Sequence, residues 1–142
     1  GDIGKIGLAV TPANPELVYA TIEASNEEKG FYRSMDKGES WEKRSNYTSG
    51  GTGPHYYQEI FASPHQFDRV YQMDVWMHVT NDGGDNFINL QTETKHSDHH
   101  AMAFDPNDED YLLYNLDLGL AGFIEQVYAP PQQWGVTLRM DW

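Results

Sequence analysis

The sequence contains no cysteine, few basic residues and no long apolar run. The lack of cysteine excludes disulfide bonds and thiolate metal sites. Nine basic residues against 22 acidic ones give a formal charge of −13. That balance argues against nucleic acid or anionic lipid as a partner, because both require a basic surface. No apolar stretch approaches the length of a transmembrane helix, so we expect no membrane insertion by this segment.

The composition is nevertheless that of a folded domain. Hydrophobic residues make up 39% of the 142 positions and aromatic residues 13%, which is unlike a disordered chain. The sequence starts at Gly1 rather than at a methionine and ends at Trp142 within a pattern. We therefore expect it to be an excerpt of a longer protein, and no signal peptide is visible in it.

An octet occurs twice, at Ser34–Trp41 and at Thr80–Phe87. Its aspartate can accept hydrogen bonds from backbone N–H groups and so fix a tight turn. Its glycine supplies a positive φ, and its aromatic residue can cover the turn with apolar surface. We predict two hairpin turns of this kind. The shared positions are Ser34, Asp36, Gly38 and Trp41 in the first copy and Thr80, Asp82, Gly84 and Phe87 in the second.

A longer repeat is in phase with the octets. Prolines at Pro12, Pro64 and Pro106 each follow a short apolar run and precede a pair of strand-forming residues. They are 52 and 42 residues apart, near the roughly 40–50 residues of a four-stranded propeller blade. The repeat predicts an all-β chain without helices.

Each repeat is expected to contain short strands. In the first they are 5–10, 17–24, 31–34 and a strand from Trp41; in the second they are 57–62, 69–73, 77–80 and 87–90; in the third they are 99–104 and 111–115. The corresponding blades are predicted at 4–46, at 56–90 and, incomplete, at 98–120, with the tail 121–142 unassigned.

The octets resemble the Asp-box of bacterial-neuraminidase-type repeats, which occur in sialidases, sortilin-type receptor domains and xyloglucanase-like glycoside hydrolases. The resemblance covers about residues 4–120 and implies a partial β-propeller of about two and a half four-stranded blades. The remaining blades of the parent chain would be partners of this segment. In these families the box is a structural turn far from the ligand face. The resemblance also implies a secreted or periplasmic protein.

In a propeller of this type the ligand face would lie opposite the octets, at 46–56, 74–76, 91–98 and 115–117. Glycoside hydrolysis usually needs two carboxylates about 5–9.5 Å apart. We predict that two of Asp74, Asp98 and Asp117 could serve as this pair, since each belongs to a different blade. The alternative is that each carboxylate caps a turn or a strand end.

The run from His96 to Pro106, which begins His-x-Asp-His-His, resembles the lead-in of sortilin-like, glycosyl-hydrolase-type repeat proteins. Imidazole and carboxylate groups can bind zinc, but a hydrogen-bonded structural cluster is the other interpretation, and we assign no metal or cofactor. Aromatic residues could stack on sugar rings or pack between blades. The predicted ligand-binding residues are His99, His96, His55, Tyr57 and Trp76.

Three functions remain open, because one fold can host all of them. The first is a carbohydrate-active or carbohydrate-binding propeller similar to repeat glycoside hydrolases. The second is a sortilin-like propeller that binds a peptide or protein and catalyses nothing. The third is an assembly factor of the photosystem-associated propeller type.

Overall fold

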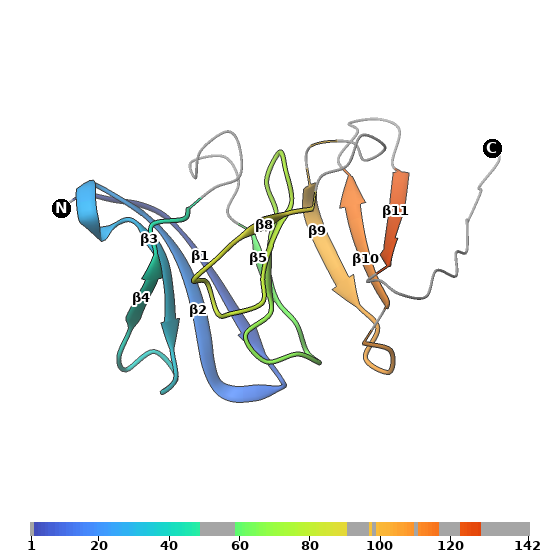
Figure 1. The fold of residues 1–142 in the computed structure, drawn as a ribbon, viewed down its shortest axis with the longest axis horizontal. Coiled ribbons are helices and arrows are strands. Elements are labelled where there is room, and N and C mark those ends of the chain that lie inside the picture. The colour runs from blue at the N-terminus through green and yellow to red at the C-terminus, as the bar shows by residue number, and fades with distance from the viewer. Residues whose placement is uncertain are drawn as a thin grey trace.

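The computed structural model describes residues 2–48, 59–90, 97, 99–109, 111–116 and 123–128, the last two ranges by their backbone alone. These residues form three antiparallel sheets and a single 3-10 turn at Asn26–Glu28 (η1), with no α-helix in the described ranges. The chain is all-β. The sheets follow one another in chain order and lie side by side (Figure 1), as successive blades of a partial β-propeller do.

Each sheet is a simple meander, in which every strand pairs with its neighbour in sequence. The first blade comprises β1 (Ile3–Thr11), β2 (Asn14–Ala24), β3 (Gly30–Ser34) and β4 (Glu42–Ser45). The second comprises β5 (Ile60–Ala62), β6 (Val70–Gln72), β7 (His78–Thr80) and β8 (Ile88–Asn89). The third comprises β9 (His99–Phe104), β10 (Tyr111–Leu116) and β11 (Phe123–Tyr128).

The predicted strands are all present, with differences of a few residues at their ends. The structure starts β2 at Asn14, earlier than expected, because the turn after Thr11 is tight and pairs Thr11 with Asn14. Leu8, Ile60 and Met102 each stand four residues before a repeat proline, and each lies in the first strand of its sheet. The unassigned tail also contributes a strand, since β11 pairs with β10 along its whole length.

Alternation along the strands divides each sheet into two faces. In the first blade, Tyr19 and Phe31 point toward the second blade and are 1% and 0% exposed. They form one core cluster with Ile60 and Val70 of the second blade. This packing of one blade's face on the next blade is the main hydrophobic core of the described chain.

The second and third blades repeat this arrangement. Tyr71 and Val79 of the second blade lie in a cluster against which Met102 and Phe104 of β9 pack. The rings of Tyr71 and Phe104 are 5.8 Å apart between centroids. The second blade therefore presents one face to the first blade and the opposite face to the third.

Candidate functional site

The first octet closes the turn between β3 and β4. The Ser34 hydroxyl accepts the N–H groups of Asp36 and Gly38 at 3.2 and 2.8 Å and donates to Asp36 Oδ1 at 2.7 Å. Asp36 Oδ1 also accepts the Ser40 N–H at 2.8 Å. The turn is therefore fixed by two side chains, whereas the sequence assigned this role to the aspartate alone. Hydrogen bonds from Ser40 and Ser34 lower the pKa of Asp36 to about 2.

The second octet makes the same turn between β7 and β8. The Thr80 hydroxyl accepts the N–H groups of Asp82 and Gly84 at 3.3 and 2.9 Å, and Asp82 accepts the backbone N–H of Asn86 at 3.0 Å. Burial opposes the ionisation of Asp82, but hydrogen bonds from Asn86 and Thr80 outweigh it and lower the pKa to about 2. Gly38 and Gly84 have φ values of +92° and +102°, as predicted for both glycines.

Trp41 lies differently from what the sequence suggested. A Trp buried over its turn was expected, but the side chain is 41% exposed. Its indole N–H donates to the Gly38 carbonyl at 3.0 Å, so the ring covers the turn on one side only. In the second octet, Phe87 is packed between Phe31 and Tyr47, with ring centroids 5.2 and 3.8 Å away.

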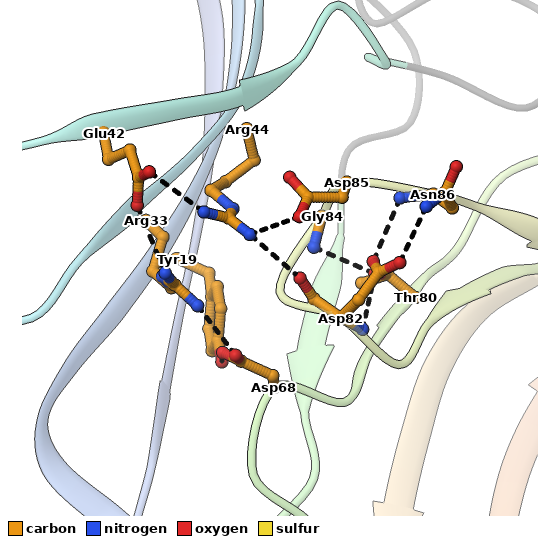
Figure 2. Close-up of polar contacts among 10 residues, drawn as sticks. All are labelled: Tyr19, Arg33, Glu42, Arg44, Asp68, Thr80, Asp82, Gly84, Asp85 and Asn86. Carbon is orange, nitrogen blue, oxygen red and sulfur yellow. Dashed lines mark hydrogen bonds and ion pairs between the residues drawn. The ribbon is translucent and has the colours of Figure 1, made fainter.

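A polar network joins the first two blades at the octet end (Figure 2). The Tyr19 hydroxyl donates to Asp68 Oδ1 at 2.7 Å, and Arg33 Nη1 donates to Asp68 Oδ2 at 2.7 Å. Both Arg33 and Asp68 side chains are only 15% exposed. Burial and the hydrogen bond to Asp68 raise the pKa of the Tyr19 hydroxyl well above its ordinary value.

Arg44 makes the second half of the network. It pairs with Glu42 at 3.0 Å within the first blade and with Asp85 of the second octet. It also donates to the carbonyl of Asp82 at 3.3 Å. Hydrogen bonds from Arg44 and then Arg33 lower the pKa of Glu42. The network joins the two blades through ion pairs and hydrogen bonds, so we assign it a structural role.

The opposite end of the blades carries the residues predicted to bind a ligand. Asp74 follows β6, is 0% exposed and accepts the N–H of Val75 at 2.6 Å. Its carbonyl accepts the N–H of His99 at 3.0 Å, which links the second blade to the third. Trp76, two residues after Asp74, is 46% exposed. The same loop thus buries its carboxylate and exposes its indole.

His99 is fully buried at the start of β9, and His100 is half-buried beside it. The other predicted site residues, Asp98, Asp117, His96, Tyr57 and His55, lie outside the described residues. Neither the separation of the predicted carboxylates nor the extent of the histidine cluster is therefore defined by the structure, and the catalytic assignment stays a prediction.

Sequence reasoning missed two buried polar groups at this end. Gln72 is 0% exposed and donates from Nε2 to the Thr48 carbonyl at 2.7 Å. Within the described ranges, Gln72 Oε1 and the Tyr47 hydroxyl are buried without a hydrogen-bond partner. Burial, and then the negative charge of Asp74, raise the pKa of Tyr47. The only sequence signal for Gln72 was its place in an otherwise apolar strand.

No group of three or more histidine, aspartate or glutamate side chains in the described ranges is placed to hold a metal ion. No helix in the described part of the chain is long and apolar enough to cross a membrane.

No protein family matches the sequence, and no curated protein matches it. The chain is similar in structure to "YCF48 bound to D1 peptide", with 11% sequence identity and a TM-score of 0.42. The match covers 83% of this chain and 38% of that chain.

Proposed function

We propose that this segment belongs to an Asp-box β-propeller that binds a peptide or protein segment at its Trp76 end and does not hydrolyse glycans. The observation that carries this proposal is the contrast within one loop. Asp74 is fully buried and its carboxylate accepts the N–H of Val75, whereas Trp76 is 46% exposed. A glycosidase needs a carboxyl group that reaches the scissile bond, while a binding surface needs an exposed aromatic residue.

The hydrogen bonds of the octets support the Asp-box part of the proposal. A hydroxyl accepts two backbone N–H groups and an aspartate accepts a third in both copies. In both turns the hydroxyl and the aspartate carboxylate are therefore bound within the turn itself. The octet end is thereby committed to structure, and the loops of the opposite end remain for recognition.

Charge favours a basic ligand. The chain has 13 more acidic than basic residues, and such a field attracts cationic partners and accelerates their association. A peptide that carries lysine or arginine beside an apolar residue fits this field, because the apolar residue can stack on Trp76 while the cations stay solvated.

Binding of the full chain to a peptide array tests the proposal. The array contains basic, neutral and acidic peptides that each hold one aromatic or aliphatic anchor. Basic peptides are expected to bind best, and Trp76→Ala is expected to weaken that binding by about tenfold or more, as loss of an aromatic anchor does. Phe67→Ala is the matched control, since Phe67 is 54% exposed and lies in the turn between β5 and β6 at the octet end.

A glycan array and a polysaccharide hydrolysis assay on the same protein can contradict the proposal. Trp76-dependent binding to glycans but not to peptides would replace the peptide ligand by a carbohydrate. Hydrolysis that is lost in Asp74→Asn would restore the glycosidase interpretation and overturn the proposal.

A further inference from the structure

His78 stands two residues after the exposed Trp76 and is bonded to its backbone. It is the first residue of β7 and is half-buried. Its Nδ1 is 3.0 Å from the Trp76 carbonyl oxygen. A carbonyl oxygen can only accept a hydrogen bond, so Nδ1 carries the proton of the neutral ring and donates it. The other ring nitrogen, Nε2, is then left with a lone pair and can accept a hydrogen bond.

The imidazole of His78 is also held by an aromatic neighbour. The ring of Tyr47, which follows β4 of the first blade, is 5.4 Å from the imidazole between centroids. Tyr47 is stacked in turn on Phe87 at 3.8 Å. Because one nitrogen is bonded to the backbone and the ring packs against Tyr47, the orientation of the imidazole is set before any ligand arrives.

Nε2 of His78 is the ring nitrogen that a ligand can reach. It makes no hydrogen bond to a residue in the described ranges. It is also not one of the side-chain nitrogens and oxygens there that are buried without a partner, so solvent reaches it. His65 of the same blade differs, because its Nε2 donates to the Asp105 carbonyl of the third blade at 2.6 Å. His65 uses Nε2 within the fold, whereas His78 leaves it for a ligand.

The charges near His78 favour a cation over an anion. Within the described part of the chain, the titratable groups placed near the imidazole are Tyr47 and Asp74. Burial, and then the negative charge of Asp74, raise the pKa of Tyr47, so the phenol stays neutral. The strands on either side of β7 place Gln72 and Asn89 opposite His78, and neither of these side chains titrates. Asp74 is therefore the charged group of this set, and it attracts a cation.

We propose that His78 is a specificity-determining residue of the Trp76 end, whose Nε2 accepts a hydrogen bond from a lysine ammonium of the bound peptide. This inference rests on the proposed function and names the polar contact that it lacks. The apolar neighbour of the lysine stacks on Trp76, one ammonium N–H donates to Nε2 and the other two stay in water. Net charge attracts any cation, whereas the Nε2 lone pair selects one that has an N–H.

Two peptides that differ by methyl groups test the assignment. One is a lysine peptide that the array identifies, and the other is the same peptide with that lysine trimethylated, which keeps the positive charge but has no N–H. Calorimetric titration of the full chain is expected to show about tenfold tighter binding of the lysine peptide, as one hydrogen bond to a charged group provides. This comparison uses the unsubstituted chain, so it does not depend on the folding of a variant.

Two variants locate the preference within the second blade. His78→Phe keeps a ring against Tyr47 but has no acceptor, so it is expected to bind the two peptides about equally. His65→Phe is the matched control, because His65 is also half-buried and bonded to a carbonyl but lies at the octet end. It is expected to keep the tenfold preference.

Acid supplies a second measurement. Histidine side chains gain a proton between about pH 8 and 5, and a proton on Nε2 removes the lone pair and adds a positive charge beside the lysine. Binding of the lysine peptide is therefore expected to weaken as the pH falls from 8 to 5. The weakening should be much smaller in His78→Phe, while His65→Phe should follow the unsubstituted chain.

Two outcomes would overturn this inference while the proposed function stands. One is equal binding of the lysine and trimethyl-lysine peptides to the full chain, in a manner that still requires Trp76. The other is a preference for lysine that persists in His78→Phe. A chain that binds no peptide through Trp76 would overturn both the inference and the proposed function.

Discussion

The two octets make the same hydrogen bonds, yet their aromatic residues have different surroundings. Phe87 is enclosed by Phe31 and Tyr47 of the adjacent blade. Trp41 has no blade on its side among the described residues and is 41% exposed. The turn itself is the same in both, with matching positive φ values at Gly38 and Gly84.

The turn of each octet is fixed by local bonds, whereas the surroundings of its aromatic residue depend on the neighbouring blade. Hydroxyl, aspartate and glycine close the turn through bonds within a few residues, so the turn forms wherever the octet occurs. The aromatic residue depends on another blade for its contacts, as does Asp85 of the second octet, which pairs with Arg44 of the first blade. The first and second blades therefore offer matched pairs of positions, one covered and one open, that substitutions can compare.

The largest contrast is expected between Phe31→Ala and Trp41→Ala. Phe31 is 0% exposed and contacts Tyr19, Phe87 and Gly84, so its loss should cost about 3–5 kcal/mol of unfolding free energy. Trp41→Ala should cost only about 1 kcal/mol, because much of the ring is already in water. Urea unfolding followed by circular dichroism measures both. Equal losses would show that Trp41 is buried in solution.

Substitution of the octet glycines is expected to give the next largest difference in unfolding free energy between the two blades. Gly38→Ala and Gly84→Ala both place a Cβ at a positive φ, which costs about 1 kcal/mol in each blade. At Gly84 the Cβ must also displace the Phe31 ring, which should add about 1–3 kcal/mol. The same unfolding experiment compares them, and a Gly38→Ala variant as unstable as Gly84→Ala would contradict the open space at the first octet.

Removing one carboxylate from each blade should give a smaller difference in unfolding free energy between the two blades. Asp68→Ala leaves Tyr19 and a mostly buried Arg33 without their acceptor, and should cost about 1.5–3 kcal/mol. Glu16→Ala breaks an ion pair with Lys37 in which the side chains are 53% and 64% exposed, and should cost at most about 1 kcal/mol. Stability of the two variants at pH 7 and at raised salt tests this, and only the Glu16 effect should fade with salt.

The smallest effect is expected on folding stability at low pH, where the two octets should behave alike. Asp36 and Asp82 have pKa values of about 2 in the fold against an ordinary value of 3.8. Their contribution is therefore complete above about pH 4 and is lost as the pH falls through about 2. Asp36→Asn and Asp82→Asn should each flatten the fall in stability between pH 4 and 2. Carboxyl shifts followed by NMR provide the check, and an unshifted pKa at either position would contradict its turn.

Much of the fold could be predicted from spacing. Proline-anchored strand pairs and the octets located β1, β5 and β9 and the turns at Asp36 and Asp82, because these features depend on neighbouring residues. The sequence assigned no structure to residues 121–142, where β11 lies, since pairing with β10 is a tertiary choice. Of the predicted site, Trp76 proved exposed and Asp74 buried, which no local pattern distinguishes.

The sequence by itself determined the period of the repeat, the strands and the geometry of two turns, all of which follow from alternation, proline, glycine and short side-chain hydrogen bonds. Only the tertiary structure decided which face of each strand meets another blade. Leu8 and Ile60 occupy the same repeat position, but one is 63% exposed and the other 6%. The physical reason is that burial depends on which surface lies opposite a residue, and neighbouring residues in the chain do not contain that information.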